Sequence, residues 1–207
     1  LDWFPKMNGA DVLGLASGGG QQCPIFAALG ANVTVFDNSP RQLAMDELVA
    51  KREGMTNLRT VQGDARDLSA LLDASFDLVF HPVSNLFIPE ITSVWKEAFR
   101  VLKPGGVLLA GFMNPIFYIF DWMKAEKGEL QVTYKLPYAD VDHPEMKEAQ
   151  MQAGNPLEYS HSLTDQIGGQ VSAGFHIVGF YEDRHGATAI SEYTPTYIAT
   201  RAIKPKY

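Results

Sequence analysis

One stretch decides the fold of this chain: residues 10–22, which read ADVLGLASGGGQQ. Residues 12–15 form a short apolar run, which is typical of a buried strand, and residues 17–20 form a loop with almost no side chains. Phe26 and Leu29 then follow at helical spacing, and Gly30 is placed to end that helix. Strand, glycine loop and helix in this order predict the start of a nucleotide-binding βαβ unit.

The second strand of this unit supplies an acidic residue. It covers residues 33–36 and ends at Asp37, which lies about 20 residues beyond the loop. A carboxylate there can accept hydrogen bonds from both hydroxyls of a ribose. The glycines let a ligand approach the backbone, and the helix N-terminus offers free N–H groups to a carboxylate or phosphate. These residues alone predict a site for an adenosine-containing molecule.

The chain continues to alternate helices and strands. Ser39, Pro40 and Gln42 form a capping box that predicts a helix start. Helices are expected at residues 40–53, 94–102 and 163–173, and strands at residues 58–62, 76–80, 107–112, 175–182 and 197–203. This alternation predicts an α/β fold with a doubly wound, mostly parallel sheet and helices on both faces. The final two strands have no helix between them, so we expect them to pair antiparallel.

The alternation breaks at residues 113–160, which form an insert after the fifth strand. It carries the aromatic cluster Phe117, Tyr118, Phe120 and Trp122, and a further strand is expected at residues 130–135. Because ligands bind at the carboxyl ends of such strands, we expect the insert to form a lid over a substrate within a single domain, residues 1–207. The chain begins without methionine, so an N-terminal segment is expected to be missing.

Composition narrows the function classes. A formal charge of −7 and a pI near 5.2 argue against a broad nucleic-acid or anionic-membrane surface. The single cysteine, Cys23, fits a reducing compartment, and we expect the protein to be cytoplasmic. The histidines show no metal-ligand spacing with one another or with Cys23, so no metal site is expected. The oligomeric state stays open.

Five motifs in order resemble the class I S-adenosylmethionine-dependent methyltransferases, in particular bacterial small-molecule methyltransferases of uncharacterised specificity. The motifs are GLASGGG at residues 14–20, the acid Asp37, GDA at residues 63–65, FDLV at residues 76–79 and LKPGG at residues 102–106. The resemblance implies a seven-stranded sheet with an antiparallel last strand, S-adenosylmethionine as cofactor and a small-molecule methyl acceptor. Two departures stand out. Gly14 occupies the usual acidic position, and Ala16 replaces the first glycine.

The resemblance also implies which residues form the site. Cofactor contacts are expected from Ala16, Ser17, Gly18, Gly20, Asp37, Asn38, Asp64, Ala65 and His81. His81, at the end of the fourth strand, is the candidate catalytic base, and Tyr118, Trp122 and His161 are candidate substrate contacts. Each has a structural alternative: Asp64 as a helix cap, the histidines as hydrogen-bonded core residues, and the aromatics as core.

Two other functions compete with methyl transfer. A nicotinamide oxidoreductase would use the same glycine loop and Asp37, but its chemistry needs a tyrosine with a lysine four residues later. None of the tyrosines at positions 118, 134, 138, 159, 181, 193 and 197 has such a lysine, which rejects this class. A domain that binds S-adenosylmethionine without catalysis, as a sensor or partner subunit, stays open.

Overall fold

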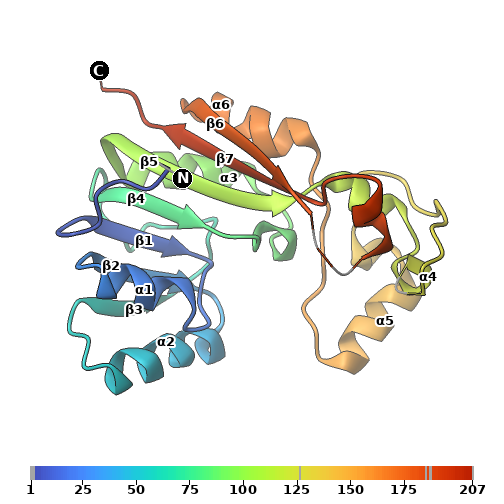
Figure 1. Cartoon of the computed structure of the whole chain (residues 1–207), viewed down its shortest axis with the longest axis horizontal. Helices are drawn as coiled ribbons and strands as arrows, with labels where there is room; N and C mark the ends of the chain where they lie inside the picture. Colours follow the sequence, from blue (N-terminus) through green and yellow to red (C-terminus); the bar gives the residue numbers. More distant parts are fainter. Residues whose placement is uncertain (1–2, 126, 185, 187, 207) are drawn as a thin grey trace.

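The sheet of this protein has seven strands. The computed structural model describes residues 3–125, 127–184, 186 and 188–206. The strands are β1 (Asp11–Leu15), β2 (Asn32–Asp37), β3 (Leu58–Gln62), β4 (Phe76–His81), β5 (Leu102–Met113), β6 (His176–Asp183) and β7 (Tyr197–Ile203). Their order is β3-β2-β1-β4-β5-β7-β6. The first five strands are parallel, and β7 pairs antiparallel with both β5 and β6 (Figure 1). The predicted fold class is confirmed.

Helices cover both faces of this sheet. They are α1 (Gln22–Ala28), α2 (Pro40–Arg52), α3 (Thr92–Val101) and α6 (Gly169–Ser172), whereas α4 (Trp122–Ala125) and α5 (Pro144–Ala153) lie in the insert (Figure 1). Neighbouring strand residues point to opposite faces, so Val12 packs with Phe26 of α1 on one side. Leu13 packs on the other side in the cluster that contains Trp95 of α3. Both clusters are buried. A shift of a strand by one residue would turn its side chains to the opposite face, so this burial fixes the strand register.

A local capping box sets the start of α2, whereas a contact with α3 determines the residue at which α6 begins. The Ser39 Oγ accepts a hydrogen bond from the Gln42 N–H at 3.3 Å, as the capping box predicts. The helix expected at residues 163–173 is a π-helical turn, Thr164–Gly168, that runs into α6. Gly169 lies there because a Cβ would come within 2.6 Å of the Trp95 ring. This contact brings α6 against α3.

No helix lies between β3 and β4 in the described part of the chain. Residues 63–75 form a loop whose Leu68 and Leu71 fill the core in its place. Arg100 of α3 fixes this loop by donating to the carbonyls of Leu68 at 2.7 Å and Leu71 at 3.0 Å. Side-chain donors therefore hold the loop over this face of the sheet.

The insert consists of short elements beyond the carboxyl end of β5 (Figure 1). It contains α4, α5 and the 3₁₀ turns Pro115–Ile119 and Asp140–Asp142. The strand expected at residues 130–135 is wrong, because this segment makes only one isolated bridge, between Val132 and Phe120. Phe120 lies between the 3₁₀ turn Pro115–Ile119 and α4, so a longer ladder has no partner strand there. No helix among the described residues is long and apolar enough to cross a membrane.

Candidate functional site

The loop after β1 has a backbone conformation suited to glycine at position 16, which is occupied by alanine. Ala16 has a φ of +47°, and its N–H donates to the Phe36 carbonyl at 2.7 Å. At position 14, a Cβ would lie 2.3 Å from the Cys23 Sγ and 2.4 Å from the Ser17 Oγ. Those two atoms are themselves within hydrogen-bond distance, at 3.2 Å. The space that an acidic side chain would need at position 14 is therefore filled.

Two carboxylates hold the loop by accepting hydrogen bonds from its backbone N–H groups. The Asp37 Oδ2 accepts from the Gly18 N–H at 3.0 Å, and its Oδ1 accepts from the Ser39 N–H at 2.9 Å. The Oδ2 of Asp46, which is fully buried in α2, accepts from the Gly19 N–H at 2.8 Å. Burial raises the pKa of Asp46. Asp46 was not among the predicted site residues, although it follows Leu43 by three residues on the buried side of α2.

A cavity of about 790 Å³ opens above this loop at the carboxyl ends of the strands. It brings together these predicted site residues: Ala16, Ser17, Gly18, Asp37, Asn38, Asp64 and Ala65. Other parts of its wall were not predicted, among them Gln21 and Gln22 beside the loop, residues 82–84 after β4, and residues 154–156 of the insert. The location after β4 was a usable signal, because it is the same sheet edge.

Asp64 lies in a turn at the cavity wall. Its Oδ1 accepts from the Arg66 N–H at 2.9 Å, and its Oδ2 is 2.6 Å from the Arg66 guanidinium. Hydrogen bonds from Arg66 lower the pKa of Asp64. Both side chains are partly exposed, and no helix begins here, so Asp64 is not a helix cap. Arg66 also lines the cavity and competes for the Asp64 carboxylate.

Gly20 and His81 do not line this cavity. A Cβ on Gly20 would lie 2.9 Å from the Met45 carbonyl, so Gly20 packs against α2. His81 is fully buried, with its Nδ1 2.9 Å from the Leu15 carbonyl and its ring edge-on to Trp95. Burial lowers the pKa of His81 to about 4, so the ring is neutral and donates from Nδ1. This position does not support the predicted roles of base and cofactor contact.

His161 also lies away from the cavity. It is 8% exposed, and its Nε2 is 3.1 Å from the Asn85 carbonyl. Burial lowers its pKa. The geometry supports the structural alternative, a hydrogen-bonded core histidine, over a substrate contact.

A second cavity, of about 370 Å³, lies between the insert and Phe87, in the segment after β4. Its walls are mainly aromatic: Phe87, Phe117, Tyr118, Phe120, Trp122, Tyr134 and Tyr138, with Asp140, Gln150, Asn155, Pro156 and Glu158. The predicted substrate residues Tyr118 and Trp122 thus face one space. Phe87, Asn155 and Pro156 line both this aromatic cavity and the larger one, so the two cavities adjoin.

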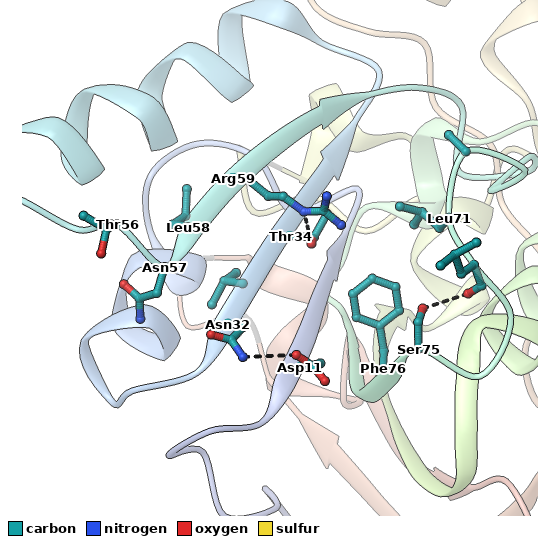
Figure 2. Close-up of a pocket in the computed structure, with 13 residues that line it drawn as sticks. Asp11, Asn32, Thr34, Thr56, Asn57, Leu58, Arg59, Leu71, Ser75 and Phe76 are labelled. Carbon is teal, nitrogen blue, oxygen red and sulfur yellow. Dashed lines mark hydrogen bonds between the residues drawn. The ribbon is translucent and has the colours of Figure 1, made fainter.

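Figure 2 shows a third cavity, of about 550 Å³, at the opposite edge of the sheet. It lies where β1 and β2 begin, at Asp11 and Asn32. The Asn32 amide donates to Asp11 at 3.1 Å, and the Arg59 guanidinium donates to Thr34 at 2.9 Å. Its polar side chains are thus largely paired with one another, and it lies away from the glycine loop. Within the described residues, no group of three or more acidic, histidine or cysteine side chains could hold a metal ion.

Comparison with known proteins bears on the glycine-loop cavity. A methyltransferase domain model matches residues 13–110, which include the loop, Asp37 and Asp64. The chain is 50% identical over 205 residues to YbaJ, an uncharacterized methyltransferase of Bacillus subtilis. That alignment covers 98% of this chain and 80% of YbaJ. The chain belongs to the class I S-adenosylmethionine-dependent methyltransferases.

More distant matches agree with this family. This methyltransferase is 27% identical over 192 residues to a sterol 24-C-methyltransferase of Aspergillus fumigatus, covering 91% of the chain but only 45% of that protein. An S-adenosylmethionine-dependent methyltransferase from Mesorhizobium loti has the same fold, with a TM-score of 0.74 and 18% identity. That superposition covers 97% of this chain and 94% of the other. The family that the motifs predict, with its cofactor, is confirmed.

The cavity of this methyltransferase fits that cofactor. Its volume lies within the range of small-molecule sites, about 300–1,000 Å³. A Cβ on Gly18 would lie 2.8 Å from the Gln42 Cβ and 3.1 Å from the Asp37 Oδ2, so the loop leaves the approach to Asp37 open only as glycine. Carboxylates at Asp37 and Asp64 supply acceptors for ribose hydroxyls and a base amine.

Proposed function

We propose that this methyltransferase transfers the methyl group of S-adenosylmethionine to a small-molecule acceptor bound in the aromatic cavity. The observation that carries the proposal is the contact between the two cavities through Phe87, Asn155 and Pro156. A transfer reaction needs two ligand sites that meet at the reacting atoms, and this arrangement provides them.

The larger cavity is the cofactor site in this proposal. Asp37 accepts the ribose hydroxyls with the lone pairs that its bonds to Gly18 and Ser39 leave free. Asp64 and Ala65 contact the base, and Ala16 and Ser17 contact the methionine end. When bound, S-adenosylmethionine supplies a sulfonium methyl group that is already activated for attack by a nucleophile.

The protein's own task is positioning. Holding two reactants in line can lower a barrier by about 7–11 kcal/mol. The insert, residues 113–160, closes the acceptor site in this proposal, because its residues 154–156 line the cofactor cavity while its aromatic rings line the neighbouring one. Such a lid excludes water from the reacting atoms.

The size and charge of the aromatic cavity support a small molecule over a nucleic acid. Its volume is about 370 Å³, and among the described residues that line it the charged side chains are Asp140 and Glu158, which would repel phosphate. The acceptor named for the sterol relative does not transfer, because less than half of that protein aligns. We place the reaction in the cytoplasm, where the free thiol of Cys23 stays reduced.

Transfer of a labelled methyl group tests the proposal. The protein is incubated with methyl-labelled S-adenosylmethionine and a low-molecular-weight metabolite fraction, and the labelled products are identified by mass spectrometry. We expect a labelled small molecule whose formation falls strongly in the Trp122→Ala variant. Cofactor binding without any labelled product would instead support the non-catalytic binding domain.

A further inference from the structure

The aromatic cavity has an unusual pairing of wall groups. Seven aromatic side chains line it, and the two side chains of formal charge are both acidic, Asp140 and Glu158. No lysine, arginine or histidine is among its lining residues in the described part of the chain. Aromatic faces carry negative potential, and they attract cations as carboxylates do. The whole wall therefore favours positive charge.

The two carboxyl groups differ in what they already bind. Both Asp140 oxygens accept hydrogen bonds, from the Tyr138 hydroxyl at 2.6 Å and from the Glu158 N–H at 2.8 Å. For Glu158, the described residues provide one such bond, from the Tyr118 hydroxyl to Oε2 at 2.9 Å. Asp140 is thus a structural anchor for the segment that carries Glu158. The second Glu158 oxygen is left for a ligand.

Glu158 also lies close to the junction of the cavities. It follows Pro156, which lines both of them, by two residues in a segment without helix or strand. The next residue, Tyr159, donates its N–H to the Leu86 carbonyl at 2.7 Å, and Leu86 adjoins Phe87 of the junction. The carboxyl is therefore held near the end of the aromatic cavity where the methyl group must arrive.

We propose that the acceptor is an amine with an apolar or aromatic body, whose nitrogen binds between the aromatic rings and Glu158 and receives the methyl group. This inference rests on the proposed function and names its substrate class. Burial and the nearby Asp140 raise the pKa of Glu158, and none of the described residues that line the cavity is a cation that could compensate this carboxyl. An ammonium group would supply that cation.

The same groups account for the transfer. The amine arrives as its ammonium form and gives one proton to the Glu158 carboxylate, which frees the nitrogen lone pair. That pair forms the new N–C bond while the C–S bond breaks and its electrons stay on sulfur, leaving a thioether and a methylated ammonium. The aromatic faces stabilise the positive charge that develops on nitrogen. Glu158 then releases its proton to solvent.

Binding of two matched probes tests the inference without any turnover. Phenethylamine and phenethyl alcohol have nearly the same shape, and each is titrated calorimetrically into the protein saturated with S-adenosylhomocysteine. We expect the amine to bind about tenfold more tightly than the alcohol. In Glu158→Gln, which keeps an acceptor for Tyr118, we expect this preference to fall to about twofold.

The control is Glu129→Gln, which removes an equal charge from an exposed position of the insert. It should keep the full preference for the amine. Both variants should bind S-adenosylhomocysteine like the wild type, because neither residue lines the cofactor cavity. Equal binding of the two probes, or an unchanged preference in Glu158→Gln, would overturn the inference. If the binding preference failed in this way but the protein methylated a neutral acceptor, the proposed function would still hold.

Discussion

Acid should destabilise this protein through His81, because the folded core has no room for a charged imidazole. The pKa of His81 is lowered by burial from 6.5 to about 4. The unfolded chain therefore takes up the proton first, so the stabilising contribution is complete above pH 6.5 and is lost as the pH falls toward 4. One pKa unit corresponds to about 1.4 kcal/mol, which gives a loss of about 2 kcal/mol at pH 5 and about 3 kcal/mol at pH 4.

Urea unfolding of the wild type and of His81→Asn between pH 7 and pH 5 measures this loss. Asparagine can still donate to the Leu15 carbonyl but does not titrate. The difference in free energy of unfolding between the two proteins should shift by about 2 kcal/mol in favour of the variant at the lower pH. Comparing the two cancels the opposite contributions of Asp46 and Glu158, whose pKa values are raised in the fold.

If His81→Asn leaves the pH dependence of the free energy of unfolding unchanged, His81 titrates in contact with water. The placement of its ring in the core would then be refuted, and its role as a base would be open again.

Three substitutions and one pair test the rest of the site. Asp37→Ala should weaken binding of S-adenosylhomocysteine by about 1.5–3 kcal/mol in calorimetry, and Asn should recover part; an unchanged Kd would show that this acid does not hold the ribose. Asp46→Ala removes the charged acceptor of the Gly19 N–H and leaves the Gln42 carbonyl at 3.1 Å as its partner, so urea unfolding should show a loss of about 1–3 kcal/mol; no loss would remove the anchoring role of Asp46. Ala16→Gly should raise the free energy of unfolding by up to about 1 kcal/mol, because glycine adopts a φ of +47° without strain, and a clear loss would contradict this. Tyr118→Ala and Trp122→Ala should impair methyl transfer far more than cofactor binding, whereas joint loss of cofactor binding and thermal stability would make these rings core.

The sheet and the cofactor loop were predictable because their signals are local. A capping box, a glycine stop and an apolar run each act within a few residues, and Asp37 follows directly from the end of β2. His81 shows where such reasoning fell short. It lies two residues after Val79, which packs in the cluster around Trp95, so the alternation of a strand directs both side chains toward α3.

The walls of the two cavities depend on contacts between distant segments. Phe87 and Tyr138 meet in one cavity from opposite ends of a long stretch of sequence, and no local pattern predicts that meeting. The expected strand at residues 130–135 failed for the same reason, since a strand needs a partner and Val132 finds only Phe120. Gly14 likewise needed the structure, which shows Ser17 and Cys23 in the space of the missing acid.

Calorimetric titration of Gly18→Ala tests the location of the cofactor site most directly. Alanine there would bring its Cβ within 2.8 Å of the Gln42 Cβ and 3.1 Å of the Asp37 Oδ2, whereas Gly168→Ala meets nothing closer than 3.7 Å and serves as control. We expect Gly168→Ala to bind S-adenosylmethionine and S-adenosylhomocysteine with the same Kd values as the wild type, and neither protein to bind NAD. Gly18→Ala should bind both ligands at least ~10-fold more weakly. A wild-type Kd in Gly18→Ala, or binding of NAD in place of the methyl donor, would contradict the account.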